Sequence, residues 1–157
     1  MDDGAGGRRD ALTVAYGFLN RRERTVQEVR GRLERAGCEA SEIDAAIGEL
    51  VEFGYLDDAR FARLFAQDKR ELESWGRERI ARTLRERGIE RGLIEAALGE
   101  QPAGGELERA RELLARRFPG GVGADPRGRE RAFGVLVRKG YNTEVAADAV
   151  RSFSAGG

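Results

Sequence analysis

The chain has 157 residues, of which 36% are charged and 7% aromatic, and its basic and acidic side chains are equal in number. It contains no histidine and one cysteine, Cys38, which excludes histidine-containing metal sites, histidine acid–base chemistry and disulfides within the chain. Many charges, few aromatics and only 3 prolines predict an all-α protein. No apolar run reaches the ~20 residues that cross a bilayer, and no signal-peptide core follows Met1, so we expect a cytoplasmic location.

The first predicted unit spans residues 10–54 and consists of three helices. Residues 1–9 before it are rich in glycine and charge, and we expect them to form a disordered tail. Thr25 opens the middle helix, and Glu28 three residues later completes a capping-box pattern. Short links between the three helices predict a small bundle.

A helix end, a tight turn and a helix start follow one another after Phe53. Gly54 fits the left-handed position after a helix, and we expect Tyr55 to pack back onto that helix end. Asp57 can cap the next helix, and Asp58 carries negative charge where the helix dipole favours it. Because adjacent helical side chains diverge by about 100°, this carboxylate pair is interpreted as structural and not as a metal or catalytic site.

The same plan recurs at spacings of 51 and 52 residues, measured between Gly37, Gly88 and Gly140, which we call the repeat glycines. Apolar residues keep fixed distances from these glycines, and the glycine fixes the phase of each helix, so we predict three tandem three-helix-bundle repeats. Repeats this small have marginal cores of their own, which favours shared apolar surfaces and an elongated curved rod. The aligned apolar positions are Val29, Ile80 and Ala132; Leu33, Leu84 and Leu136; Ile43, Ile94 and Ala146; and Ile47, Leu98 and Val150.

The remaining boundaries follow from this alignment and from glycine and proline. The second repeat is predicted over residues 55–101, a linker over 102–105, the third repeat over 106–153 and a frayed end over 154–157. The third repeat differs from the others by a long loop of glycines and prolines, residues 118–128, which we expect to be flexible.

No arrangement of residues predicts catalysis. The glycines near residue 121 lack the strand, helix start and lysine of a phosphate-binding loop, and no Ser, Cys or Lys has an evident base beside it. Trp75 and Tyr141 could stack on nucleic-acid bases, but both occupy positions where a core residue is expected. We therefore predict no enzyme activity, no cofactor and no metal.

Basic residues are the candidates for binding a partner. Net charge rises from −3 over residues 1–54, with 8 basic and 11 acidic residues, to +3 over 102–157, with 10 and 7. A surface rich in exposed basic side chains could bind phosphates or an acidic protein. The alternative is a solvated face with local ion pairs, such as Glu78 with Arg82. The predicted partner-binding residues are Arg77, Arg79, Arg82, Arg85, Arg127, Arg129, Arg131, Arg138 and Lys139.

Several of these segments together resemble the RecX family of recombination regulators. The resemblance spans about residues 11–153, is most specific between Gly54 and Leu98, and is looser in the third repeat, where the glycine–proline loop departs from a compact unit. It is carried by Gly54-Tyr55-Leu56-Asp57-Asp58-Ala59-Arg60-Phe61-Ala62, by Trp75-Gly76, Ile80, Leu84, Gly88-Ile89 and Ile94, and in the first repeat by Thr25, Glu28, Leu33 and Gly37.

The resemblance implies tandem three-helix repeats and a modulator of the RecA recombinase. Such a protein lodges in the helical groove of the RecA filament on single-stranded DNA and suppresses its ATPase, strand-exchange and coprotease functions. The family has no catalytic residues to carry over. The leading hypothesis is therefore a non-enzymatic regulator of homologous recombination, DNA repair and the SOS response.

Two other hypotheses stay open. Three-helix units include helix-turn-helix readers, so the chain could bind DNA directly, although zero net charge disfavours this as its main role. A helical scaffold for some other protein is the third hypothesis. No long exposed apolar stripe calls for a dimer, so we expect a monomer.

Overall fold

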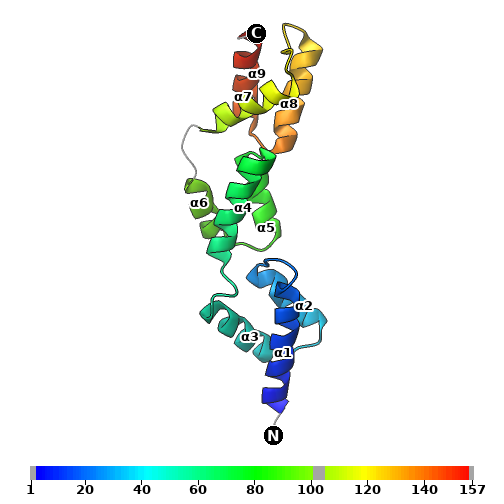
Figure 1. Ribbon diagram of the computed structural model, residues 1–157, viewed down its shortest axis with the longest axis vertical. Helices are drawn as coiled ribbons and strands as arrows, with labels where there is room; N and C mark the ends of the chain where they lie inside the picture. The colour runs from blue at the N-terminus through cyan, green and yellow to red at the C-terminus, as the bar shows by residue number, and fades with distance from the viewer. Residues whose placement is uncertain (1–2, 101–104, 156–157) are drawn as a thin grey trace. The chain divides into compact units, whose positions relative to one another are not determined.

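The computed structural model describes residues 3–100 and 105–155, and every regular element within those ranges is an α-helix (Figure 1). The all-α prediction is confirmed. None of the described helices is long and apolar enough to cross a membrane. The helices in chain order are α1 (Asp3–Leu19), α2 (Val26–Arg35), α3 (Ala40–Glu52), α4 (Asp58–Glu73), α5 (Arg77–Glu86), α6 (Arg91–Gly99), α7 (Gly105–Arg117), α8 (Pro126–Lys139) and α9 (Thr143–Ala155).

The helices form three tandem three-helix repeats, α1–α3, α4–α6 and α7–α9, as predicted. The three repeat glycines, which follow the middle helices α2, α5 and α8, have φ angles of 85°, 88° and 101°. This left-handed conformation costs glycine little and lets the chain leave a helix sharply. All twelve aligned apolar residues are buried, so the phase set by the glycines is confirmed.

Residues up to Ala62 form one compact unit together with Leu84–Ile94. Its core lies where α1, α2 and α3 meet (Figure 1). Leu33 and Leu50 are fully buried there, and Leu56, after the α3–α4 turn, joins them. The first unit therefore holds the whole first repeat and the adjoining parts of the second.

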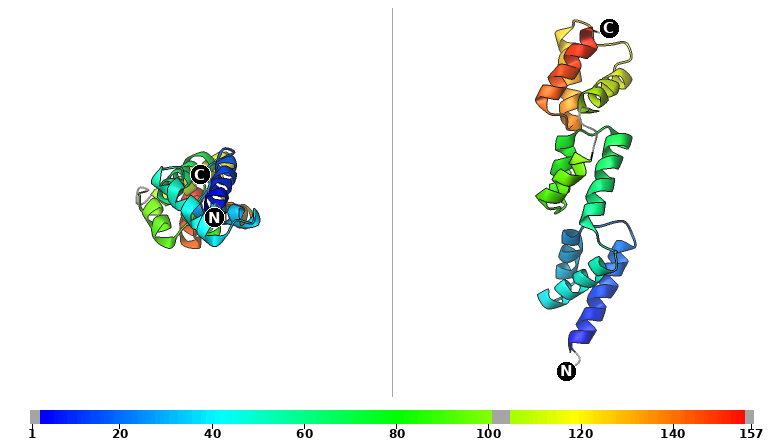
Figure 2. Two further views of the ribbon diagram at one scale, coloured as in Figure 1. Left: turned by 90° about the horizontal axis from the view of Figure 1, so that it is seen from below. Right: turned by 90° about the vertical axis from the view of Figure 1, so that its left-hand side faces the viewer.

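Residues Arg63–Thr83 and Glu95–Gly157 form the other compact unit. Its core is built by α7, α8 and α9, which pack together in the right-hand view of Figure 2. Leu114, Leu136 and Tyr141 are its largest buried side chains. Small residues on α9 allow the helices to approach closely.

The predicted caps at two helix starts are confirmed. Thr25 and Glu28 form a complete capping box at α2, with each side chain accepting a hydrogen bond from the other residue's backbone N–H. At α4, Asp57 accepts a hydrogen bond of 2.9 Å from the N–H of Arg60. Gly54 has a φ of 78°, as expected for the residue that ends α3.

The described chain begins in α1, which starts at Asp3. The disordered tail expected over residues 1–9 stays a prediction. Helix α9 ends at Ala155, and the frayed end expected over residues 154–157 stays a prediction. Met1, Asp2, the linker residues 102–104 and residues 156–157 lie outside the described residues.

Three apolar side chains on α3 and α4 lie outside the cores. Val51, Leu64 and Leu72 are exposed by 48%, 39% and 79%. On α4 the buried face is completed by Ala62 and Ala66, because small side chains allow closer helix packing than leucine would. The predicted curved rod and the repeat boundaries stay predictions.

Candidate partner-binding surface

In the second unit, the start of α5 meets the end of α8. The backbone N–H of Gly76 donates to the carbonyl of Lys139 at 2.8 Å, and the N–H of Glu78 donates to the carbonyl of Gly140 at 3.1 Å. The first N–H groups and the last C=O groups of a helix have no partner within that helix. Each helix end therefore satisfies the other, and opposite ends of two helix dipoles meet. We call this contact the second junction.

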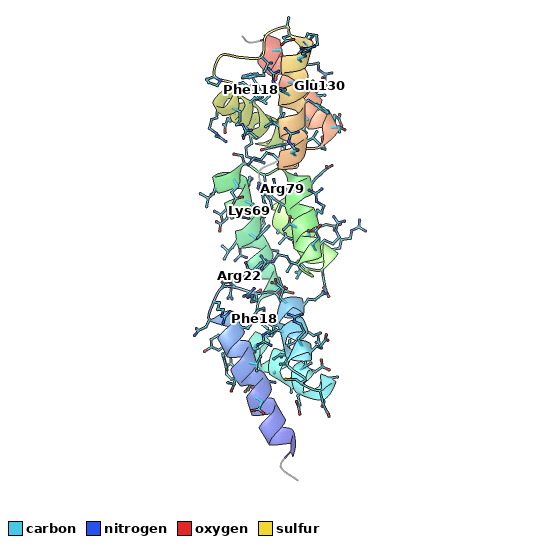
Figure 3. All side chains as sticks on the ribbon, turned by 90° about the vertical axis from the view of Figure 1, so that its right-hand side faces the viewer. Phe18, Arg22, Lys69, Arg79, Phe118 and Glu130 are labelled. Atoms are coloured by element: carbon cyan, nitrogen blue, oxygen red, sulfur yellow. The ribbon has the colours of Figure 1, made fainter. Side chains whose placement is uncertain are left out.

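Basic side chains reinforce the second junction. The guanidinium of Arg79, labelled in Figure 3, lies 3.9 Å from the centre of the Trp75 ring and donates to the carbonyl of Arg138 at 3.3 Å. The Lys139 ammonium donates to the carbonyl of Glu73 at 3.0 Å. Two of the predicted partner-binding cations, Arg79 and Lys139, thus hold the fold together.

Trp75 and Tyr141 are core residues, as expected. Trp75 is buried, and the Tyr141 hydroxyl donates to the carbonyl of Ser74 at 3.0 Å. Burial, with a smaller contribution from Glu106, raises the pKa of Tyr141 to about 12, so its hydroxyl stays a hydrogen-bond donor at neutral pH. Neither ring is available to stack on a nucleic-acid base.

Two glycines make the close approach of α5 and α8 possible. A Cβ atom on Gly76 would lie 2.5 Å from the carbonyl carbon and oxygen of Gly140 and from the nitrogen of Tyr141. A Cβ atom on Gly140 would overlap the Cβ of Arg79. Because the obstructing atoms at Gly76 are backbone atoms, no side-chain rotation could relieve the clash.

The first unit contains a related contact between α2 and the end of α5, which we call the first junction. The buried Thr25 hydroxyl donates to the carbonyl of Arg87 at 2.7 Å, and the Arg87 guanidinium binds both carboxylate oxygens of Glu28, with Nη2–Oε1 at 2.9 Å and Nε–Oε2 at 3.3 Å. The N–H of Val26 donates to Asp58 Oδ1 at 3.0 Å. The Asp57–Asp58 pair is therefore used for structure, because each carboxylate holds a helix start.

The two junctions pair the same positions of the repeat. Thr25 and Gly76 each precede the glycine of their own repeat by twelve residues, and Arg87 and Lys139 each stand immediately before the glycine of the next repeat. In both cases the earlier residue donates a hydrogen bond to the carbonyl of the later one. Position twelve before the repeat glycine is therefore the docking position of the fold.

The pKa values of two carboxyl groups in the first junction, those of Glu28 and Asp58, are shifted in opposite directions. Burial opposes ionisation of Glu28, but hydrogen bonds from the Thr25 N–H and from Arg87 outweigh it and lower the Glu28 pKa. Burial raises the pKa of Asp58, and the nearby carboxylate of Asp57 adds to the rise. Among the described residues, no group of three or more acidic or cysteine side chains could hold a metal ion.

The nine predicted basic residues divide into two groups. Four of them, Arg77, Arg79, Arg129 and Lys139, donate from their side chains to backbone carbonyls. Within residues 3–100 and 105–155 no ion pair joins the other five to a carboxylate, and the local pair of Glu78 with Arg82 does not form. These five exposed residues are Arg82, Arg127, Arg131 and Arg138 in the second unit and Arg85 in the first.

Two aromatic side chains, those of Phe53 and Tyr55, are exposed in the first unit. Phe53 is 65% exposed and Tyr55 is 56% exposed. The Tyr55 ring meets Tyr16 edge to face with ring centres 5.4 Å apart. Leu56 is buried in the core of the first unit, and the N–H groups of Tyr55 and Leu56 both bond to the carbonyl of Leu50.

A cavity of about 700 Å³ lies beside α2 in the first unit. The Arg24 guanidinium borders it, 3.9 Å from the centre of the Phe18 ring. Burial and the neighbouring Arg22 lower the Arg24 pKa. Because Glu34 and Glu86 line the same cavity, its mixed charges favour no particular class of ligand.

Comparisons with known proteins agree with the motifs of the first two repeats. Family models described as the first and second three-helix domains of RecX match residues 11–50 and 57–98. The regulatory protein RecX of Trichlorobacter lovleyi is 36% identical over 87% of this chain and 90% of its own length. That of Halorhodospira halophila is 37% identical over 94% of this chain and 86% of its own length.

Solved structures show the same fold. The crystal structure of RecX from Lactobacillus salivarius matches with a TM-score of 0.80 and 19% identity, covering 96% of this chain and 99% of that one. A second crystal structure, of a regulatory protein RecX, matches with a TM-score of 0.78 and 20% identity over 94% of this chain and 74% of that one. At this identity the likeness concerns the fold alone.

Proposed function

Because the chain belongs to the RecX family of regulatory proteins, we propose that it regulates homologous recombination and DNA repair by binding the RecA filament on single-stranded DNA. Binding inhibits the ATPase, strand-exchange and coprotease activities of RecA. The chain acts without catalysis of its own, as a monomer in the cytoplasm. Support comes from the two family domains and from relatives matched over most of their length.

The exposed arginines are the proposed contacts with the filament. Arg82, Arg85, Arg127, Arg131 and Arg138 are solvated and have no carboxylate partner among the described residues. An unpaired guanidinium can bind a carboxylate or phosphate with two parallel hydrogen bonds without first breaking an internal ion pair. This absence of internal pairing is the observation that carries the assignment.

The four basic residues that hold backbone carbonyls are also candidates, with a different role. Arg77, Arg79, Arg129 and Lys139 position the helices that present the exposed group. Removing one of them would weaken binding through the fold, together with a loss of stability. Loss of binding at constant stability would instead identify a direct contact.

The decisive experiment uses the purified chain and preformed RecA filaments on single-stranded DNA. We expect DNA-dependent ATP hydrolysis to fall as the chain is added, and strand exchange and coprotease cleavage of the SOS repressor to fall with it. Heat-denatured chain serves as the control for nonspecific effects. Unchanged ATP hydrolysis at equimolar chain and RecA would overturn the proposal.

Direct DNA binding is the second candidate function, because the exposed arginines could also meet phosphates. Zero net charge makes it the weaker candidate. The two are separated by measuring affinity for bare DNA against salt concentration. Tight DNA binding with a steep salt slope, and no binding to RecA, would favour this second function.

A further inference from the structure

The docking position, twelve residues before each repeat glycine, is buried against a backbone carbonyl in both junctions. Thr25 is 0% exposed and meets the carbonyl of Arg87. Gly76 is buried, and a Cβ atom there would meet the carbonyl of Gly140. In each case the carbonyl belongs to the end of the middle helix of the next repeat.

The third repeat has a docking position but no following repeat. Counting back twelve residues from Gly140 leads to Gly128, near the start of α8. Gly128 is nevertheless buried, and a Cβ atom on it would lie 3.0 Å from the carbonyl oxygen of Val122. A backbone carbonyl therefore covers the docking position here as well, and it comes from the chain's own α7–α8 loop.

Several contacts hold that loop, whose expected flexibility stays a prediction. Asp125 caps α8, accepting a hydrogen bond of 3.1 Å from the N–H of Arg127, and Pro126 occupies the first helical position. The Arg129 guanidinium donates to the carbonyl of Ala124 at 3.2 Å. Val122 and Phe118, the latter labelled in Figure 3, pack against the core of the second unit.

The other end of the repeat series is open. Gly37 has the same left-handed conformation as the other two repeat glycines, with a φ of 85°. Among the described residues, no atom lies within 4 Å of the Cβ position at Gly37, whereas Gln27 and Arg79 crowd the same position at Gly88 and Gly140. The end of α2 thus corresponds to the ends of α5 and α8 in the two junctions, but no helix start among the described residues packs beside Gly37.

We infer that the α7–α8 loop, residues 118–125, is a cap that covers the docking surface at the start of α8. The partner that this surface fits is the end of α2 in a second copy of this chain, where the position beside Gly37 is open among the described residues. Repeat proteins need such caps because an uncovered terminal repeat binds further repeats. The cap ends the series at three repeats and keeps copies from associating head to tail.

The test removes the cap from the full chain. In a cap-deleted variant, Gly-Ser replaces residues 119–124, and sedimentation velocity follows its mass at rising concentration. We expect the cap-deleted variant to self-associate at micromolar concentration while the unaltered chain stays monomeric. Adding Gly128→Leu to the cap-deleted variant should abolish association, because the leucine occupies the space of the incoming backbone. A folded cap-deleted variant that remains monomeric, or an unaltered chain that associates equally, would overturn the inference.

A second variant keeps the test informative if the cap-deleted variant does not fold. In the full-length chain, Gly128→Leu should displace the loop, so limited trypsin cleavage at Arg117 and Arg127 should become severalfold faster at unchanged helical circular dichroism. Gly120→Leu is the matched control, because its Cβ position has no neighbour within 4 Å among the described residues and cleavage should not change. Equal cleavage of both variants would show that the loop does not rest on Gly128.

Discussion

The hydroxyl of Thr25 donates a 2.7 Å hydrogen bond to the backbone carbonyl of Arg87, 62 positions further along the chain. The same oxygen accepts a hydrogen bond of 3.2 Å from the N–H of Glu28 at the start of α2. One fully buried side chain therefore caps a helix and joins two repeats. Local sequence rules account for the cap alone.

Replacing Thr25 with alanine should lower the free energy of unfolding by about 1–3 kcal/mol, because the helix loses its cap and the Arg87 carbonyl loses a buried donor. Urea unfolding followed by circular dichroism measures the change. Thr25→Ser is the control and should cost less than about 1 kcal/mol, since the hydroxyl remains. Equal losses for alanine and serine would mean that the methyl group, and not the hydroxyl, matters here.

Two Gly→Ala substitutions should have opposite effects on stability. Gly76→Ala should destabilise the chain by about 1–3 kcal/mol or more, because the added Cβ atom meets the backbone of Gly140. Gly92→Ala on α6, which has no neighbour within 4 Å among the described residues, should instead stabilise by about 0.5 kcal/mol through its better helix propensity. An unchanged free energy of unfolding for Gly76→Ala would contradict the close packing of Gly76 against Gly140 in the second junction.

The first junction should make stability depend on pH. The Glu28 pKa lies below its ordinary value of 4.5 in the folded chain, so the unfolded chain binds the proton first. Glu28 therefore contributes stability above pH 4.5, and this contribution is lost as the pH falls through its folded pKa. We expect Glu28→Gln to flatten the fall in unfolding free energy at acid pH, as measured by urea unfolding across the acid range.

Asp58 provides the opposite case in the same junction. Its pKa is raised above the ordinary value of 3.8, so ionised Asp58 lowers stability above its folded pKa, and this penalty fades as the pH falls. Asp58→Asn keeps an acceptor for the Val26 N–H and should steepen the acid loss of stability. The assignment fails if both substitutions change the slope in the same direction.

Reversing the charge of two exposed arginines should weaken filament binding. We expect Arg82→Glu with Arg85→Glu to reduce affinity for RecA filaments about tenfold or more, because carboxylates would face the acidic groups that the arginines contact. Fluorescence anisotropy of labelled filaments measures the affinity, and circular dichroism verifies the fold. Arg63→Glu with Arg111→Glu, two other exposed arginines, is the matched control. Equal affinities for the two double variants would assign Arg82 and Arg85 to the solvated face.

Sequence periodicity predicts the core better than it predicts the surface. Leu33, Leu84 and Leu136 could be placed because a glycine after the middle helix fixes the phase of each repeat, and all three are fully buried. The exposure of Val51 and Leu72 could not be predicted in this way, because a helix near the surface has apolar residues on more than one face. Their exposure depends on which helix packs beside them, and the local sequence pattern does not specify that neighbour.

The candidate surface was predictable in composition but not in geometry. Arg79 and Arg82 look alike in the sequence, yet Arg79 binds the carbonyl of Arg138 and Arg82 is solvated. The difference arises because the second junction brings α8 to the start of α5. Aligning Thr25 with Gly76 would have identified the docking position, whereas the hydrogen bonds made there require the three-dimensional structure.

The chain's one tryptophan gives the second junction its own spectroscopic signal. Trp75 is buried between two cations, with Lys69 at 4.8 Å and Arg79 at 3.9 Å from the ring centre. Tryptophan emission depends on the polarity and charge around the indole, so a shift in its wavelength would report the parting of α5 from α8. Tryptophan emission measured during filament binding can therefore show, without any label, whether the contact between α5 and α8 stays closed or opens.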